Sequence, residues 1–361
     1  MKVLFIRYKK SKGIFEGGEQ GTEEKFRALS AAVDNNIDTY YIHDENKKRT
    51  LKDYFHGVWY FPQGYFFGLT PRRVDEIIGL SPKYDVIWID RSIFGILAKK
   101  LKESDYRGKI IGFFHNVETV YFDAKLSRRM PFRHLVLQCV DKNDRWTCQY
   151  CDKIVTLTSR DSDTINNLYQ RKADKCIPIL FRDKYHKDVY PEGMTDTKPL
   201  CTVLAAYFAP NNEGILWFVR NVLPKVDVKF RIVGKGMARL KEEQPELANI
   251  DVYSDVPDLA PYFEEADMMI LPIFAGSGMK VKTCESLMYG KNILATDEAL
   301  EGYQVEEGIS AWRCNTAEKF IACINEFAAH PKPRFNQAAR ECFLENYSST
   351  AVEKMFRELL A

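Results

Sequence analysis

Residues 274–290 read FAGSGMKVKTCESLMYG, and this stretch decides the interpretation of the chain. It sets a glycine-rich turn and two lysines, Lys280 and Lys282, ahead of Glu285 on an expected helix. At such a helix start, unpaired backbone N–H groups meet the positive end of the helix dipole. The stretch therefore predicts a phosphate-binding site, with a buried strand at 292–296 following it.

The spacing of polar residues sharpens this prediction. A helix that starts near Ser277 places Gly278, Lys282 and Glu285 close to one face, because positions three, four and seven apart stack along a helix. A carboxylate there can hold a ribose diol while the preceding turn holds a diphosphate. The alternative interpretation is a helix that carries a solvated Lys–Glu pair.

Length and composition bound the function. A chain of 361 residues is long enough for two domains, and its 45% hydrophobic content suffices for packed cores. The formal net charge of +2 argues against a general nucleic-acid binder, which usually carries a strong basic excess. Any anion site must therefore be local.

Targeting signals and cysteine usage favour the cytoplasm. The first apolar run is too short for a signal peptide, and none approaches the ~20 residues that span a bilayer. Nine cysteines lie in segments that resemble core, as expected for reduced thiols. Cys148 and Cys151 form a CxxC without a second pair at zinc-finger spacing, so we expect two buried thiols on a helix.

Apolar strand-like runs alternate with helical patterns along the whole chain, which predicts parallel sheets with crossover helices. The expected strands are 3–6, 39–42, 86–89, 110–114 and 153–157 in the first half, and 201–205, 229–233, 250–253, 268–272 and 292–295 in the second. The predicted organisation is a first α/β domain at 1–190, a linker at 191–199, a second α/β domain at 200–345, and a C-terminal segment at 346–361 whose amphipathic helix packs back on the first domain.

Several motifs in this order resemble the GT-B glycosyltransferases of the group that includes the retaining family four. Residues 206–218 (AYFAPNNEGILWF), 230–236 (FRIVGKG) and 254–267 (SDVPDLAPYFEEAD), together with 274–290, are similar to that family's donor domain. Residues 112–118 (GFFHNVE) and a Gly17–Gly18 turn after the first strand are similar to its acceptor domain.

The resemblance implies an α/β GT-B fold, with two Rossmann-like domains facing each other across a cleft that holds a nucleotide sugar. Ligands of such sheets lie beyond the carboxyl ends of the strands, where Gly17, Gly18, His115, Gly234 and Ser277 are expected. By similarity, Glu285 takes the ribose hydroxyls, and the backbone of Val256, Gly234 and Gly236 flanks the base.

Two departures from the family pattern concern the donor site. Gly278 stands where the family usually has a first glutamate, so we expect backbone N–H groups of Gly276, Ser277, Gly278 and Met279 to contact the sugar instead. The family's usual Arg and Lys are replaced by the APNNEG of 209–214. Lys280 and Lys282 are then the candidates to neutralise the diphosphate, with Lys280 in a catalytic role.

No metal or other cofactor is expected. The sequence lacks an Asp-x-Asp on a loop of the kind that would hold Mg²⁺ or Mn²⁺, because Asp161 and Asp163 fit the first turn of a helix. His115 follows an apolar strand and is a candidate for contact with the sugar or a phosphate, or for proton transfer; the alternative is a cap at the strand end. Glu118 is a candidate for an acceptor contact, or a base if the enzyme inverts.

Two further segments suggest an acceptor. Residues 54–67 hold eight aromatics in fourteen positions, and residues 125–134 carry Lys125, Arg128, Arg129 and Arg133 around apolar residues. A lipid-linked acceptor at a membrane surface would account for both segments. An aromatic loop in the core and a solvated basic helix would account for them equally well.

We therefore predict a cytoplasmic hexosyltransferase that moves a sugar from a nucleotide donor to a glycan or lipid-linked acceptor, as in polysaccharide biosynthesis, with retention and without a metal. Peripheral contact with the inner face of the membrane is part of this expectation, and nucleic acid is not an expected partner. The alternatives are a sugar-nucleotide epimerase or hydrolase on the same fold, and a catalytically silent subunit that binds a nucleotide.

Overall fold

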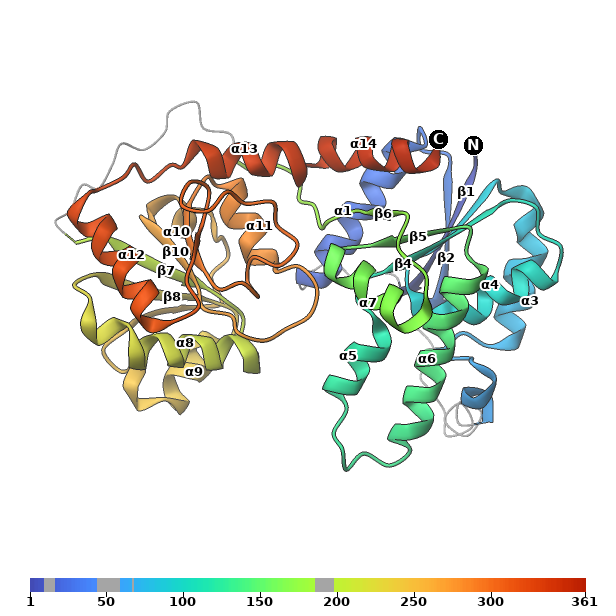
Figure 1. The fold of residues 1–361 in the computed structure, drawn as a ribbon, viewed down its shortest axis with the longest axis horizontal. Helices are drawn as coiled ribbons and strands as arrows, with labels where there is room; N and C mark the ends of the chain where they lie inside the picture. The colour runs from blue at the N-terminus through green and yellow to red at the C-terminus, as the bar shows by residue number, and fades with distance from the viewer. Residues whose placement is uncertain (10–16, 44–58, 67, 186–197) are drawn as a thin grey trace. The chain divides into compact units, whose positions relative to one another are not determined.

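The structure is a computed structural model that describes residues 1–9, 17–43, 59–66, 68–185 and 198–361 (Figure 1). Contacts divide the chain into two compact units: unit 1 comprises Met1–Pro178 and Glu353–Ala361, and unit 2 comprises Ile179–Val352. Residues 179–185, which we assigned to the first domain, thus group with unit 2. Most of the predicted linker at 191–199, and the aromatic residues at 54–58 and 67, lie outside the described residues.

Unit 1 is built on a six-stranded sheet in the order β2-β1-β3-β4-β5-β6, with every pairing parallel. The strands are β1 (Val3–Lys9), β2 (Ile37–His43), β3 (Val86–Ile89), β4 (Lys109–Phe114), β5 (Lys153–Thr156) and β6 (Lys175–Cys176). The helices are α1 (Gly17–Ala32), α3 (Pro71–Leu80), α4 (Gly95–Glu103), α5 (Glu118–Lys125), α6 (Arg133–Tyr150) and α7 (Ser159–Tyr169), with short 3₁₀ turns η1 (Phe61–Gln63), η2 (Ser81–Lys83) and η3 (Ser92–Phe94).

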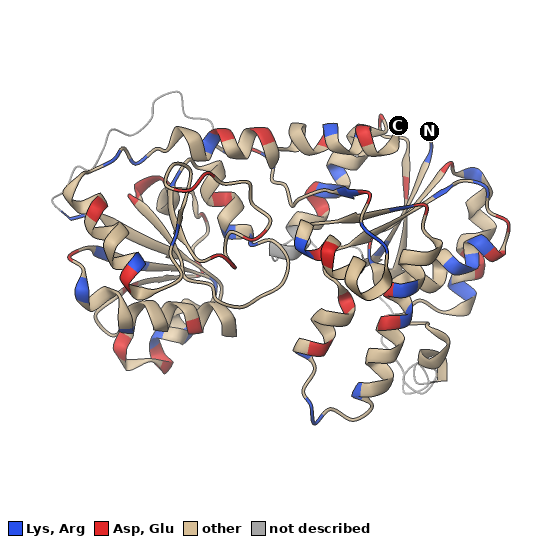
Figure 2. Cartoon of the chain, in the orientation of Figure 1, with Lys and Arg blue, Asp and Glu red and all other residues tan. Residues whose placement is uncertain are grey.

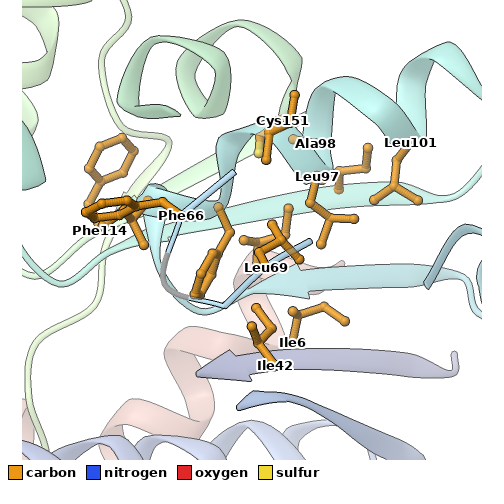
Figure 3. Close-up of a cluster of buried hydrophobic side chains, with 14 of the residues drawn as sticks. Ile6, Ile42, Phe66, Leu69, Leu97, Ala98, Leu101, Phe114 and Cys151 are labelled. Carbon is orange, nitrogen blue, oxygen red and sulfur yellow. The ribbon is translucent and has the colours of Figure 1, made fainter. Parts of the chain in front are cut away.

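Helices cover both faces of this sheet. On one face, residues of α3, α4 and α6 pack with alternate strand residues such as Ile6 and Phe114, and Figure 3 shows this cluster around Phe66 and Leu97. On the other face, the Phe5 ring contacts Phe26 of α1 with centroids 5.2 Å apart, and Trp88 contacts Phe356 at 5.6 Å. Burial on both faces explains why β3 is a continuous apolar run.

Unit 2 has the same plan, with a parallel six-stranded sheet in the order β12-β11-β10-β7-β8-β9. Its strands are β7 (Leu200–Leu204), β8 (Lys229–Gly234), β9 (Asp251–Ser254), β10 (Met268–Leu271), β11 (Asn292–Ala295) and β12 (Trp312–Arg313). Its helices are α8 (Ala209–Asn221), α9 (Met237–Glu243), α10 (Ala260–Glu265), α11 (Val281–Met288), α12 (Ala317–Ala329) and α13 (Gln337–Asn346), with 3₁₀ turns η4 (Leu223–Lys225) and η5 (Pro245–Leu247).

The last helix, α14 (Ser349–Leu360), contains the point where the two units divide, because Glu353–Ala361 group with unit 1. Its apolar residues Val352, Phe356, Leu359 and Leu360 are buried. Within unit 1, Lys153 of β5 donates a hydrogen bond to the Leu359 carbonyl. The amphipathic helix expected within 346–361 is therefore α14.

All ten predicted strands are present in the structure. The runs at 86–89 and 292–295 match β3 and β11 at both ends, and the others differ by one to three residues. The strands β6 and β12, which are two residues long and not fully buried, were not predicted from the sequence. Cys148 and Cys151 are buried, as expected for core thiols. None of the helices in the described ranges has both the length and the apolar character that crossing a membrane requires.

Candidate functional site

In unit 2, the predicted donor-binding residues gather where the parallel strands end. Gly234 closes β8, Val256 follows β9 by two residues, and 276–279 belong to the connection from β10 to α11. The carboxyl ends of neighbouring parallel strands lie along one edge of the sheet, so these segments share that edge.

The turn after β8 needs glycine at two positions. Gly234 has φ 147°, and a Cβ there would lie 1.8 Å from the Ala205 carbonyl oxygen. Gly236 has φ 72°, and its backbone N–H donates to the Asp255 carboxylate, 3.2 Å from Oδ1. These contacts draw the ends of β7, β8 and β9 together. Val256 lines a groove of about 430 Å³ beside them, with Arg231 and Tyr262.

The start of α11 differs from the predicted helix start near Ser277. The helix begins at Val281 and not near Ser277, because Gly278 has a left-handed φ of 62° and Lys280 is extended at the N-cap. Gly276 and Ser277 are exposed, whereas Gly278 and Met279 are buried. Gly278 therefore does not share a helical face with Lys282 and Glu285.

Lys282 and Glu285 do share a face of α11, as expected. Lys282 Nζ lies 2.6 Å from Glu285 Oε2, and the Glu285 side chain is only 11% exposed. The carboxylate thus lies one turn into the helix, largely shielded from solvent. The pair is an ion pair in a partly buried position and not the fully solvated pair of the alternative interpretation.

Lys280 also has a carboxylate partner, which the sequence analysis did not identify. Its Nζ lies 2.6 Å from Glu298 Oε1 and donates to the Gly278 carbonyl at 2.8 Å, so the lysine braces the turn that precedes α11. Glu298 follows β11 by three residues. Each lysine that we expected to face a diphosphate is therefore paired with a glutamate, and the two pairs carry no net charge. Glu298 could have been found from the sequence, because it lies just beyond the carboxyl end of the predicted strand at 292–295.

The far end of α11 is held by α13. Arg340 donates to the carbonyl of Met288, the last residue of α11, at 2.7 Å and to Asp183 Oδ1 at 2.9 Å. A cation at a helix C-terminus satisfies an otherwise unpaired carbonyl and complements the dipole. The helix that carries Glu285 is thus fixed at its last turn.

In unit 1, the predicted residues also lie beyond strand ends. Gly17 and Gly18 are the first two residues of α1, and His115 directly follows β4. The structure adds two residues that the sequence analysis missed, Lys25 of α1 and Asp90 after β3. Lys25 Nζ lies 2.6 Å from Asp90 Oδ1 and 2.9 Å from His115 Nε2.

Burial dominates the electrostatics of this cluster. It lowers the pKa of the Lys25 ammonium to about 8, although Asp90 raises it in part. Burial and the nearby Lys25 charge lower the pKa of His115 to about 4. Burial also pushes the pKa of Asp90 upward, but the charges of Lys25 and His115 outweigh it and hold that pKa below its ordinary value. At neutral pH, the cluster therefore contains a Lys25–Asp90 ion pair and an uncharged His115.

Glu118 lies at the first turn of α5 and is fully buried. Its Oε1 accepts from Arg91 Nη2 at 3.0 Å. Burial raises its pKa above the ordinary value, and Arg91 opposes this in part. The Glu118 carboxylate is thus enclosed, and the acceptor contact or base role expected at this position stays a prediction.

A second buried carboxylate lies beside Glu118. Asp144 of α6 accepts hydrogen bonds from Thr119 N and Thr119 Oγ1, both at 2.8 Å. Burial raises its pKa to about 7. This carboxyl positions the start of α5, two residues beyond the strand-end loop that carries His115.

Two α/β units with parallel six-stranded sheets, and polar residues beyond their strand ends, are the architecture of the GT-B class of fold. Residues 198–330 match the family model described as Glycosyl transferases group 1. This part of the chain is therefore a group 1 glycosyltransferase domain, which confirms the resemblance for the C-terminal half.

Solved structures agree with this fold over the full chain. HepE of Anabaena in complex with UDP is 12% identical, with a TM-score of 0.68 and coverage of 100% of this chain and 99% of that one; HepE with UDP-glucose gives a TM-score of 0.63 at 12% identity and the same coverage. Sucrose-phosphate synthase of Thermosynechococcus elongatus is 14% identical, with a TM-score of 0.70 and coverage of 99% and 98%. The lipopolysaccharide outer core galactosyltransferase WaaB is 13% identical, with a TM-score of 0.66 and coverage of 100% and 99%. The chain matches no curated protein.

Proposed function

We propose that this glycosyltransferase takes its sugar from a uridine diphosphate donor bound at the strand-end edge of unit 2. The observation that carries the proposal is the partly buried Lys282–Glu285 pair on α11, directly behind the 276–279 turn. Glu285 is the ligand for the ribose hydroxyls, and Gly234, Gly236 and Val256 flank the base. The complexes of HepE with UDP and with UDP-glucose support uridine as the nucleoside.

The diphosphate lies at the N-terminus of α11, next to Gly276, Ser277, Gly278 and Met279. Negative charge develops on the leaving oxygens as the glycosidic bond breaks, and preorganised N–H groups and lysines stabilise it. Lys280 and Lys282 supply these charges once the diphosphate competes with Glu298 and Glu285 for them. Transfer then needs no metal, and activity should survive EDTA; loss of activity with EDTA and rescue by Mn²⁺ would overturn this part of the proposal.

Transfer proceeds with retention in this proposal. The leaving phosphate accepts the acceptor's proton on the same face of the sugar, so no protein base is required. The burial of Glu118 supports this, because an enclosed carboxylate is poorly placed to act as the base for inversion. An NMR assignment of the anomeric configuration of the first-formed product tests it, and an inverted product contradicts it.

The acceptor in this proposal is a glycan or a lipid-linked sugar, met at the inner face of a membrane. Figure 2 shows basic residues in the loop between α5 and α6. Met130 and Phe132 of this loop are 41% and 67% exposed, and Arg128 and Arg129 are exposed beside them. Apolar side chains among arginines suit an anionic lipid surface.

Co-sedimentation with phosphatidylglycerol vesicles tests this membrane contact. Binding should fall with added salt and should be lost in Phe132→Ala combined with Arg128→Glu. The matched control is Leu344→Ala, which changes an apolar residue of unit 2 that is 42% exposed. Equal vesicle binding by the wild type, the double variant and Leu344→Ala would contradict a role for the loop.

A binding panel tests the donor site. We expect UDP and UDP-glucose, each at 100 times its Kd, to stabilise the protein by about 2.7 kcal/mol, with smaller shifts from ADP and GDP. A second candidate is a subunit that binds nucleotide without transfer, favoured by Gly278 at the place of the family's first glutamate. Tight UDP binding with no transfer and no donor hydrolysis would select that candidate.

A further inference from the structure

The cluster at the strand ends of unit 1 surrounds one ammonium group, that of Lys25. Lys25 Nζ has three neighbours: Asp90 Oδ1 at 2.6 Å, His115 Nε2 at 2.9 Å, and the Phe113 ring with its centroid at 3.7 Å. A lysine ammonium only donates, and here it faces a carboxylate, an imidazole nitrogen and an aromatic ring. The side chains of Lys25 and Asp90 are each 4% exposed, whereas that of His115 is 21% exposed. Only the histidine reaches the surface.

The contact between Lys25 and His115 determines where the imidazole carries its proton. An ammonium only donates, so Nε2 must present its lone pair to Lys25. A neutral imidazole with a lone pair on Nε2 carries its hydrogen on Nδ1. Nδ1 makes no hydrogen bond to any residue in the described ranges, and therefore its N–H remains available to a ligand.

The competing arrangement places a hydrogen on Nε2, directed at Asp90 Oδ1. That distance is 3.4 Å, longer than the 2.9 Å from Nε2 to Lys25 Nζ. It also requires Lys25 to be neutral, although Lys25 lies 2.6 Å from a carboxylate. The other charged groups of the cluster have their own counter-ions, since Arg7 pairs with Glu23 at 3.1 Å and Arg91 pairs with Glu118 at 3.0 Å. The distances therefore favour donation from Lys25.

We propose that Lys25 is a positioning residue that holds His115 as the neutral Nδ1–H tautomer, so that His115 donates a hydrogen bond to a sugar hydroxyl or phosphate oxygen and does not accept a proton. The inference rests on the proposed function, which it deepens by assigning His115 one of the two roles left open by the sequence. The ion pair with Asp90 fixes the position of the Lys25 ammonium, and the hydrogen bond from Lys25 fixes the tautomer of His115.

Nitrogen chemical shifts of ¹⁵N-labelled histidines test the tautomer without any ligand. The chain has six histidines, and His115→Gln assigns the relevant signal. At pH 7, long-range ¹H–¹⁵N correlations should show a protonated Nδ1 and an unprotonated Nε2 for His115. An Nε2–H tautomer or an imidazolium at this pH would overturn the inference.

Variants of Lys25 test whether this residue determines the tautomer of His115. In Lys25→Met, Nε2 should become protonated, because among the described residues Asp90 is then the one polar partner that it has. If the unpaired Asp90 prevents folding, Lys25→Met with Asp90→Asn serves instead and should lose the single Nδ1–H signature. Lys99→Met is the control, since Lys99 also lies over an aromatic ring, 4.9 Å from the Trp146 centroid, but outside this cluster. Persistence of the Nδ1–H form in a folded Lys25 variant would also overturn the inference.

Kinetics separate this inference from the proposed function. Lys25→Met should lower kcat at least tenfold while the Kd for UDP stays within twofold, and Lys99→Met should change neither. Wild-type kcat should show no acid limb near pH 6.5, because His115 does not titrate there. Failure of the tautomer test leaves UDP binding and transfer untouched, whereas absence of UDP binding in the wild type overturns the proposed function and leaves the tautomer unaffected.

Discussion

Lys280 and Glu298 form an ion pair, with 2.6 Å between Nζ and Oε1, next to the turn that opens α11. The pair links the connection after β10 to the one after β11, so two strand-end loops of unit 2 are tied together. It also means that the proposed diphosphate site contains a carboxylate that competes with phosphate for the lysine.

Glu298→Gln should tighten UDP binding. Removing the carboxylate frees the Lys280 ammonium for phosphate, and we expect the Kd to fall about threefold to tenfold at low salt, with a smaller effect at high salt. Isothermal titration at two ionic strengths measures this. Weaker binding in Glu298→Gln would show that the carboxylate supports the site.

Lys280→Met should lower kcat by roughly 10²-fold, as for the loss of one preorganised donor to a developing charge. Lys332→Met is a matched control, because Lys332 also lies beside an aromatic ring, 4.6 Å from the Trp312 centroid, but outside the turn that precedes α11. Steady-state rates of the wild type and both variants at saturating donor measure this change in kcat. A fall in kcat of less than about threefold would show that Lys280 only stabilises the turn before α11.

Glu285→Ala should raise the donor KM by roughly tenfold to a hundredfold, the effect of losing hydrogen bonds between a carboxylate and the ribose hydroxyls. The Glu285 side chain is 11% exposed, so the thermal stability of the variant must be compared with that of the wild type. Glu243→Ala, on the exposed side of α9, is the control. An unchanged donor KM would remove the ribose assignment.

Asp144→Asn should stabilise the protein at alkaline pH. Burial raises the pKa of Asp144 to about 7, so between pH 4 and 7 the folded state retains a proton that the unfolded state releases. The free energy of unfolding then falls as the pH rises through this window. Above pH 7 the buried carboxylate is charged, and the protein stays less stable by the same amount. The variant should gain up to about 4 kcal/mol at pH 8, since each pKa unit corresponds to about 1.4 kcal/mol, and little at pH 4.

Thermal unfolding across this pH range measures the effect. Asp163→Asn is the control, since that side chain is 66% exposed. A wild-type stability that rises between pH 5 and 7, with no gain from Asp144→Asn at pH 8, would contradict the assignment.

Gly234→Ala should destabilise unit 2 by roughly 2 kcal/mol or more. The new methyl group would lie 1.8 Å from the Ala205 carbonyl oxygen at a φ of 147°, where side chains are strained. Gly79→Ala is the matched control, because nothing lies within 4 Å of a Cβ at that position of α3 and helical alanine is favoured. Denaturant unfolding of both variants should give changes of opposite sign.

Strands buried on both faces were predictable because their apolar runs are continuous, as in 86–89 and 292–295. The short strands β6 and β12 were not, since two residues such as Trp312 and Arg313 carry no periodic signal. The start of α11 was misplaced because glycine fits either the first turn of a helix or the left-handed conformation that Gly278 adopts.

The places of Glu285 on a helix and of His115 after a strand could be predicted from their motifs. Their ion-pair and hydrogen-bond partners that are distant in sequence could not. Lys25 lies 90 residues before His115, and Glu298 lies 18 residues after Lys280. One signal did exist for Lys25: it shares the face of α1 that buries Ala28, Leu29 and Ala32. A lysine on the buried face of a helix indicates a buried partner, which here is Asp90.

Hydrogen exchange with and without UDP tests the central claim most directly, since it locates the nucleotide on the chain. We predict that UDP slows exchange in peptides covering 276–288, 234–236 and 255–256 of the wild type, and that Glu285→Ala loses this protection at the same UDP concentration. Protection confined to other segments, or none at saturating UDP, would contradict a nucleoside diphosphate site at the start of α11.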